Sequence, residues 1–319
     1  MEAVLYVTRK CNLSCGHCIV DKEDNSDLPT DKVETLASDY PIDRTILSGG
    51  EPFLHDNFEE LVALVPEPTV LSNGLVLSDE EYVGENSDML EELNGIQLSV
   101  EGKEETTDAR RGEGVWDRVM EAHQNLSEIG VESYLRSTYS REMMEEVGEL
   151  MEFCDAEGIS LVLFPEIGKP PLSPTENASF FDYAVEKGVV VATPDFHSYI
   201  GEGGECPAAR TRISVDVNGE IYPCQFNWDY CLGEVGDEWG LIESRIERFD
   251  RTEPVPRTCS RCDFANKCRG CGVADTWSGC PIARGLSHSE SPSRRPLKRV
   301  QETMNTLEDV GAPRGCHGC

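Results

Sequence analysis

The chain has 319 residues, with 60 acidic and 28 basic side chains, so its formal net charge at pH 7 is −32. So strong a negative field repels a phosphate backbone, which disfavours nucleic acid as a partner. No apolar run approaches the length that spans a bilayer, and the first residues carry no signal-peptide pattern. We therefore expect a cytoplasmic protein without a membrane partner.

The acidic residues are spread along the chain rather than gathered in a tail. Such a surface repels itself in dilute salt, and the repulsion is relieved when salt screens it. This pattern is typical of halophilic proteins. An acidic patch for a basic partner is the alternative interpretation.

Short apolar runs alternate with amphipathic stretches in the first half of the chain. Strands are predicted at 3–8, 44–48, 69–72, 96–100, 132–138 and 160–164, and helices at 30–38, 57–65, 79–93, 115–129 and 141–157. The alternation indicates βαβ units and a parallel sheet. Six strands are too few for an eight-stranded barrel, so we predict an α/β fold with an open, partial (β/α)6 TIM-like barrel over residues 1–165. Functional groups in such folds gather at the C-terminal ends of the strands.

The remainder of the chain is predicted to form three parts. Residues 166–204 are rich in Pro and Gly and predict a linker with one helix at 176–187. Residues 205–285 predict a small cysteine-rich α+β module, in which Asn218-Gly219 between two alternating runs indicates a β-hairpin. Residues 286–319 predict a C-terminal helix at 297–309 and a Gly-rich tail.

The chain contains 14 cysteines, a high number for a cytoplasmic protein. Disulfides are rare in a reducing compartment, so clustered cysteines indicate metal ligands. Cys154 stands apart from the clusters within a helical pattern, and we expect it to be a small buried apolar residue.

Three cysteines follow the first predicted strand: Cys11, Cys15 and Cys18. Three thiolates can bind three irons of a [4Fe–4S] cluster and leave the fourth iron open, whereas a fully cysteine-ligated cluster needs four. A zinc site with His17 as the fourth ligand is the alternative.

This Cys-x3-Cys-x2-Cys spacing, with a ring residue before the last cysteine, resembles the signature of radical S-adenosylmethionine (SAM) enzymes. The resemblance implies that the amino and carboxylate groups of SAM chelate the open iron. One-electron reduction then cleaves the sulfonium and releases a 5′-deoxyadenosyl radical. It also implies that His17 lies near the adenine, with an exposed loop residue as the alternative.

Two further strand ends carry motifs of the same family. Gly49-Gly50-Glu51 resembles its GGE motif: the glycines allow close backbone approach to a ligand, and Glu51 offers a carboxylate to an ammonium group. Asn73, within Ser-Asn-Gly after the third strand, resembles the family's TNG element. An ordinary turn is the alternative for Asn73.

The fourth strand and the segment after it resemble a further part of the family pattern, HDxxRG. By that match, Ser99 and Arg111 would bind the methionyl carboxylate, since Arg binds carboxylates through two hydrogen bonds. Thr107 replaces the family's His and Glu101 replaces its Asp. Arg136, at the end of the fifth strand, is a competing ligand, and a solvated Arg pair is the alternative.

The cysteines around the hairpin resemble the SPASM extension of these enzymes, in which seven cysteines hold two auxiliary clusters. By this resemblance one cluster is held by Cys259, Cys262, Cys268 and Cys280, and Cys206, Cys224 and Cys271 hold part of the other. The missing ligand is Cys231, Cys316 or Cys319, or that iron is open. Two residues separate Cys268 from Cys271 where the family has three, and zinc bound between Cys259 and Cys271 is the alternative.

The resemblance implies a peptide or small-protein substrate and an electron donor such as ferredoxin or flavodoxin. Sulfatase-type maturases of this group place an Asp where Gln225 stands, so that activity is disfavoured. Maturation of a haem-like or quinone cofactor is the second hypothesis. A non-catalytic iron–sulfur electron-transfer protein or a zinc-binding interaction protein is the alternative of another class. No residue is assigned to the chemistry on the substrate.

Overall fold

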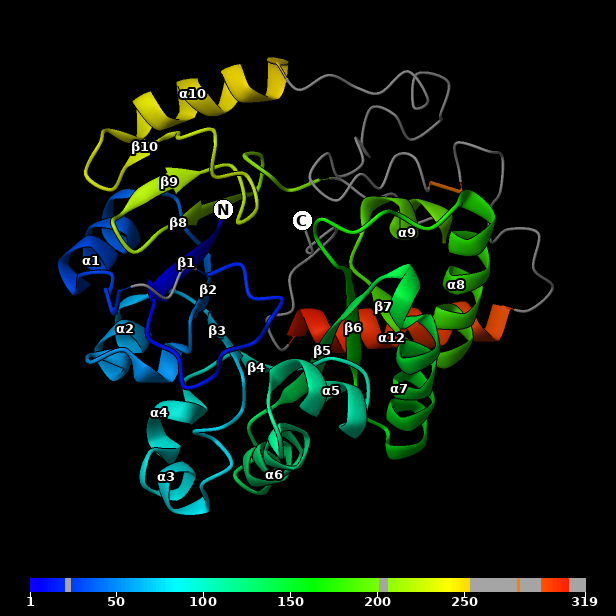
Figure 1. Ribbon diagram of the computed structural model, residues 1–319. Coiled ribbons are helices and arrows are strands. Elements are labelled where there is room, and N and C mark those ends of the chain that lie inside the picture. Colours follow the sequence, from blue (N-terminus) through cyan, green and yellow to red (C-terminus); the bar gives the residue numbers. More distant parts are fainter. Residues whose placement is uncertain (21–23, 201–205, 253–279, 282–293, 310–319) are drawn as a thin grey trace. The chain divides into compact units, whose positions relative to one another are not determined.

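The computed structural model describes all residues except 21–23, 201–205, 253–279, 282–293 and 310–319 (Figure 1). The described residues form two compact units. The first contains Met1–Tyr134 and Ala208–Thr252, and the second contains Leu135–Pro207 together with described residues of Glu253–Asp309.

The first unit is built on four parallel strands that follow one another in the chain: β1 (Glu2–Thr8), β2 (Arg44–Gly49), β3 (Pro68–Ser72) and β4 (Gly95–Val100). In β1 the side chains of Ala3, Leu5 and Val7 are fully buried. Parallel strands are covered on both faces, which explains why consecutive residues are buried along each of these strands. All four predicted strands are therefore confirmed.

Helices connect these strands: α1 (Thr30–Asp39), η1 (Pro52–Leu54), α2 (Phe58–Leu64), α3 (Glu80–Glu85), α4 (Ser87–Glu91), α5 (Glu104–Arg111) and α6 (Val115–Glu128). The helix predicted at 79–93 is interrupted at Asn86, which ends α3 and begins α4. Helix α5 was not predicted, because only Thr107 among its side chains is buried and no apolar periodicity marks it.

The predicted hairpin is confirmed and joins the same sheet. Strands β8 (Arg212–Val215) and β9 (Glu220–Tyr222) pair antiparallel, and β10 (Gly233–Glu234) pairs with β9. Strand β8 also pairs in parallel with β1, so the order in this unit is β10-β9-β8-β1-β2-β3-β4. At the turn, Gly219 has a φ of 85°, a conformation that favours glycine. Helix α10 (Trp239–Thr252) follows β10.

The second unit contains the parallel strands β5 (Ser133–Tyr139), whose first two residues belong to the first unit, β6 (Leu161–Pro165) and β7 (Val190–Val191). Its helices are η2 (Arg141–Met143), α7 (Met144–Glu157), α8 (Pro174–Lys187), α9 (Pro194–Tyr199) and α12 (Arg294–Asp309). Helix α8 begins with a capping box formed by Ser173 and Glu176. As expected, Cys154 on α7 is buried, and burial raises the pKa of its thiol to about 12.

Between α8 and β8 the sequence predicted only a linker, whereas the structure contains β7 and α9. Strand β7 has two residues, too few for a periodic pattern. Within the described residues, no helix is both long and apolar enough to cross a membrane.

Candidate functional site

The three N-terminal cysteines lie in the loop that follows β1, residues 9–26, which we call the cysteine loop. Cys18 is exposed, and Cys11 and Cys15 are partly exposed. The loop turns where the backbone N–H of Cys18 donates to the carbonyl of Cys15 at 3.2 Å. The N–H of Leu13 donates to Sγ of Cys11 at 3.5 Å, and the side-chain amide of Asn73 lies 3.9 Å from the same sulfur. Accessible sulfurs that receive such donors suit thiolate ligands of a soft metal.

Among the described residues, no three Cys, His, Asp or Glu side chains already stand in a metal-binding arrangement. The loop carries three thiols, the type of side chain that binds soft metals. All three thiols lie within eight residues of one loop.

Gly49 and Gly50 bring the end of β2 against the end of β1. A Cβ on Gly50 would lie 2.1 Å from the carbonyl oxygen of Lys10, and one on Gly49 would lie 2.3 Å from that of Thr8. The N–H groups of Gly50 and Glu51 donate to the carbonyls of Thr8 and Lys10, both at 2.7 Å. The absence of a side chain at Gly49 and Gly50 thus allows the backbone of Thr8 and Lys10 to approach closely. From the sequence we had expected these glycines to allow the close approach of a ligand.

Glu51 is fully buried and connects the ends of β2 and β3. Its carboxylate accepts hydrogen bonds from Oγ of Ser72 at 2.9 Å and from the backbone N–H of Asn73 at 2.7 Å. Burial raises the pKa of Glu51 to about 7, although the hydrogen bonds from Asn73 and Ser72 oppose this shift. Near neutral pH this carboxyl group is poised between its two forms, so a bound cation would ionise it.

Asn73 connects the end of β3 to the cysteine loop. Its side-chain Nδ2 donates to Oδ1 of Asn12 at 2.7 Å, and its Oδ1 accepts from the N–H of Leu75 at 3.0 Å. The following Gly74 has a φ of 81°. Asn73 is therefore more than a turn residue, because it positions the neighbour of Cys11.

Glu101, directly after β4, gathers three basic side chains. Its Oε1 lies 2.7 Å from Nη2 of Arg111 and 3.0 Å from Nε2 of His17, and its Oε2 lies 3.8 Å from Nε of Arg110. The side chain of Glu101 is 1% exposed. The backbone N–H of Glu101 donates to Oγ1 of Thr107 at 3.0 Å. The two family departures, Glu101 and Thr107, are thus in direct contact.

His17 and Arg111 lie near each other because both contact the carboxylate of Glu101. Nε of Arg111 is buried and has no hydrogen-bond acceptor among the described residues. Ser99, near the end of β4, is partly exposed. The role of Glu101 was missed from sequence, although a carboxylate at the end of a strand was the available signal. Arg136 belongs to the second unit, where its guanidinium lies 4.2 Å from the centre of the Phe164 ring.

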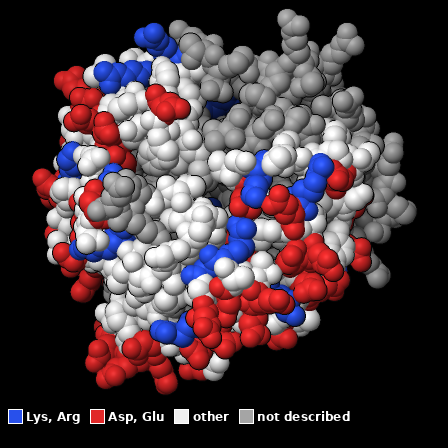
Figure 2. All heavy atoms as spheres, in the orientation of Figure 1, with Lys and Arg blue, Asp and Glu red and all other residues white. Residues whose placement is uncertain are grey.

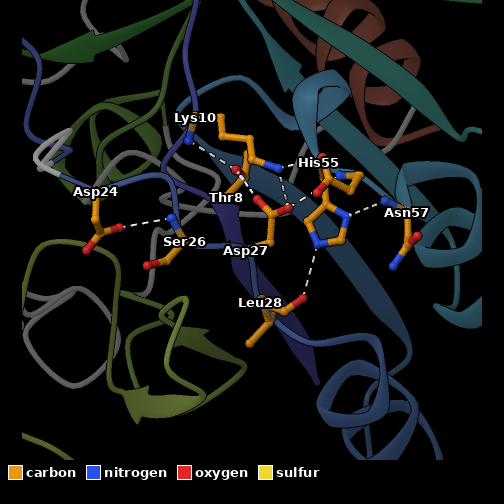
Figure 3. A network of polar contacts seen from close by, with 9 residues as sticks. Thr8, Lys10, Asp24, Ser26, Asp27, Leu28, His55 and Asn57 are labelled. Carbon is orange, nitrogen blue, oxygen red and sulfur yellow. Dashed lines mark hydrogen bonds and ion pairs between the residues drawn. The ribbon is translucent and has the colours of Figure 1, made fainter.

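A second polar network, also missed from sequence, fixes the base of the cysteine loop (Figure 3). The carboxylate of Asp27 accepts from Oγ1 of Thr8 and from Nζ of Lys10, both at 2.6 Å. His55 is buried; its Nε2 lies 3.1 Å from the carbonyl of Leu28, and its Nδ1 accepts from the N–H of Asn57. No motif marks these residues, because the contacts join distant parts of the sequence.

The cysteines expected to hold auxiliary clusters are only partly described. Cys224 and Cys280 are buried, Cys206 is partly exposed and Cys231 is exposed. Six others lie outside the described residues: Cys259, Cys262, Cys268, Cys271, Cys316 and Cys319. Gln225 is buried, 7% exposed, directly after Cys224.

The acidic side chains are distributed widely over the viewed surface, with Lys and Arg between them (Figure 2). They are most crowded along the lower right of this view (Figure 2).

Comparison with known proteins gives concordant matches. The sequence profile of the Radical SAM superfamily matches residues 5–154. The Mycofactocin maturase MftC of Mycolicibacterium smegmatis is 26% identical over 313 residues, which span 86% of this chain and 79% of that protein. The AdoMet-dependent heme synthase of Oleidesulfovibrio alaskensis is 24% identical over 345 residues, spanning 91% and 87%.

Among solved structures, native anSMEcpe with bound AdoMet and Cp18Cys peptide aligns with a TM-score of 0.67 at 17% identity. The alignment covers 96% of each chain. This likeness confirms the predicted fold class, a mixed α/β fold of the partial-barrel type.

Proposed function

Because the chain belongs to the radical SAM superfamily, and is therefore an enzyme, we propose that Cys11, Cys15 and Cys18 bind a [4Fe–4S] cluster whose fourth iron holds SAM. When bound, this group supplies the electron that cleaves SAM and so provides a 5′-deoxyadenosyl radical. The observation that carries the proposal is convergence: the cysteine loop, Glu51, Asn73 and Glu101 all lie at the C-terminal ends of β1–β4.

In this proposal Glu51 receives the ammonium group of SAM. An ammonium beside a buried carboxyl group favours its ionised form, because opposite charges lower the pKa that burial has raised. The hydrogen bonds from Ser72 and Asn73 hold the carboxylate in one orientation. Gly49 and Gly50 contribute by placing Glu51 beside the start of the cysteine loop.

Arg111 and Ser99 are proposed to bind the methionyl carboxylate, and His17 to lie near the adenine. The buried Nε of Arg111 supports this role, because a carboxylate would satisfy a donor that lacks an acceptor among the described residues. Arg111 already contacts Glu101, so that contact must rearrange or be shared on binding. Before SAM binds, Glu101 holds the side chains of His17 and Arg111 close to each other at the end of β4.

The test is reductive cleavage of SAM. Anaerobically reconstituted protein with dithionite should release 5′-deoxyadenosine and methionine, and Cys11→Ala, Cys15→Ala and Cys18→Ala should each abolish this reaction. Cys154→Ala, at a buried cysteine on α7, is the matched control and should retain it. Turnover that persists in the three loop variants would exclude the assignment.

The substrate we propose is a peptide or small protein. The support is the whole-chain likeness to anSMEcpe, whose structure holds a peptide, and to the maturase MftC. Maturation of a haem-like cofactor is the second candidate, supported by the likeness to AdoMet-dependent heme synthase. A SAM-dependent mass change in a peptide encoded beside this gene, with none in an iron porphyrin, would decide for the first. The reverse would decide for the second.

The cysteines of residues 205–285 are proposed to form a SPASM-type module with one or two auxiliary clusters. A ferredoxin or flavodoxin is the proposed electron donor. Each [4Fe–4S] cluster holds about 4 iron, so the Cys11/Cys15/Cys18 triple Ala variant should retain about 8 with two auxiliary clusters and about 4 with one. Iron analysis of that variant tests the module; about one zinc and no iron would contradict it.

A further inference from the structure

The cysteine loop is closed at its base by a short antiparallel contact. The N–H of Arg9 donates to the carbonyl of Ser26 at 2.9 Å, and the N–H of Leu28 donates to the carbonyl of Val7 at 2.8 Å. Thr8 and Asp27 form the bridge between these two bonds. The residues that lead into the cysteine loop are therefore tied to a segment that follows Cys18 in the chain.

Asp27 lies at the centre of this closure (Figure 3). One carboxylate oxygen accepts from Oγ1 of Thr8 at 2.6 Å, and the other accepts from Nζ of Lys10 at 2.6 Å and from the N–H of Asp56 at 3.4 Å. Its side chain is 20% exposed and that of Lys10 is 23% exposed, so solvent screens the pair only partly. Nζ of Lys10 also lies 2.6 Å from Oδ1 of Asp56.

His55, in the segment after Glu51, makes a further hydrogen bond to the segment that closes the cysteine loop. Its Nδ1 accepts the N–H of Asn57 at 3.0 Å, which leaves Nε2 to carry the proton and donate to the carbonyl of Leu28 at 3.1 Å. His55 therefore holds the main chain next to Asp27, while Asp56 holds the side chain of Lys10. Both ends of the cysteine loop are attached to the same short segment that carries the GGE motif.

We infer that Asp27 is a positioning residue for the proposed cluster: with Lys10 and His55 it sets the cysteine loop and Glu51 in register before iron binds. The inference rests on the proposed role of Cys11, Cys15 and Cys18. Burial alone would raise the pKa of Asp27, but the hydrogen bonds from Lys10 and Thr8 outweigh burial and lower it. Preorganised ligands lose less freedom on binding, so their complexes form faster and dissociate more slowly.

The experiment compares Asp27→Asn with Asp24→Asn. Asp24 belongs to the same loop, pairs with Arg9 at 2.6 Å and accepts the N–H of Ser26 at 2.9 Å, but its side chain is 48% exposed and contacts neither Lys10 nor the segment after Glu51 in any described bond. In cluster-free protein, hydrogen exchange at the amides of Arg9 and Leu28 should accelerate at least tenfold in Asp27→Asn. At Leu28, whose bond to Val7 involves no contact of Asp24, exchange should stay within about twofold in Asp24→Asn.

In reconstituted protein, chelator-driven loss of the SAM-responsive EPR signal should accelerate to a similar extent in Asp27→Asn alone. The melting temperature should change little in either variant, which separates local positioning from general destabilisation. Equal behaviour of the two variants in exchange and in cluster loss would overturn the inference. If instead the proposed function is wrong, the reconstituted wild-type protein itself will show no SAM-responsive EPR signal.

Two further variants keep the test decisive if Asp27→Asn does not fold. Thr8→Val conserves shape at a fully buried position and removes one donor to Asp27, so it should accelerate exchange in the same amides. His55→Leu should accelerate hydrogen exchange at the amide of Leu28. His55→Gln can still donate to the Leu28 carbonyl, so the exchange rate of that amide should stay near the wild-type rate. Unchanged exchange in Thr8→Val and His55→Leu would overturn the inference as well.

Discussion

Glu51 is a buried carboxyl group whose ionisation would be favoured by a bound cation. It has no exposed surface and accepts hydrogen bonds from Ser72 and Asn73. If it also receives the ammonium group of SAM, Glu51→Gln should weaken SAM binding by roughly 1.5–3 kcal/mol, the value of a charge-assisted hydrogen bond. Equilibrium binding to reconstituted protein measures this change. Iron content is the control and should stay unchanged, and an unaltered affinity would return Glu51 to a purely structural role.

The pKa of Glu51 also predicts how stability depends on pH in the cluster-free protein. The folded carboxyl group keeps its proton up to about pH 7, whereas in the unfolded chain it titrates near 4.5. Its contribution to stability is therefore fully present below pH 4.5 and is lost as the pH rises to about 7. The unfolding free energy of wild type relative to Glu51→Gln should fall by roughly 3 kcal/mol across this window.

Urea denaturation at several pH values between 4.5 and 8 measures this difference. Glu59→Gln, on the exposed side of α2, is the control and should follow wild type. Parallel curves for wild type and Glu51→Gln would contradict the prediction.

At the same scale, the sequence indicated the residues that carry motifs but not their contacts. Cys11, Glu51 and Asn73 could be placed because each follows a predicted parallel strand, and such ends meet at one edge of a sheet. The contact of Lys10 with Asp56 could not, because it joins positions 46 apart through side chains common on any surface. Glu101 was noticed only as a departure from a pattern, since its three basic partners become neighbours only in the folded chain.

Between elements, Gly50, directly after β2, packs against the backbone that follows β1. A Cβ there would meet backbone rather than a movable side chain, so Gly50→Ala should displace the start of the cysteine loop. We expect a loss of at least about 2 kcal/mol of stability and poorer iron retention. Gly84→Ala, on α3 with open space around it, is the control and should be neutral or slightly stabilising. Denaturation and iron analysis of both variants check this prediction, and an equally stable Gly50→Ala protein would contradict it.

The elements that were predicted correctly have a strong local signal. Strands β1–β4 each contain a short apolar run and alternate with helical patterns, and the β8–β9 hairpin has Asn218-Gly219 at its turn. Helix α5 and strand β7 lack such a signal, because α5 is polar almost throughout and β7 contains only two residues. That β8 would pair with β1 could not be read from sequence either, since nothing local specifies a partner so far away in the chain.

For the molecule as a whole, charge is the dominant property. With 60 acidic and 28 basic residues, repulsion between like charges opposes the folded state, and added salt screens it. The melting temperature should therefore rise as KCl increases into the molar range. Thermal melts in increasing KCl test this, and a flat or falling curve would contradict the halophilic interpretation.

The pairing of β1 with β8 also affects the order in which the chain can fold. Glu2 and Arg212, which form a buried ion pair between these strands, are 210 positions apart. At roughly 5–20 residues per second, a ribosome needs on the order of 10–40 s to make the segment between them. During that time one edge of β1 has no partner, and an unpaired strand edge invites association with other chains. Efficient synthesis of this protein should therefore depend on chaperones that shield nascent strands until residue 215 has emerged.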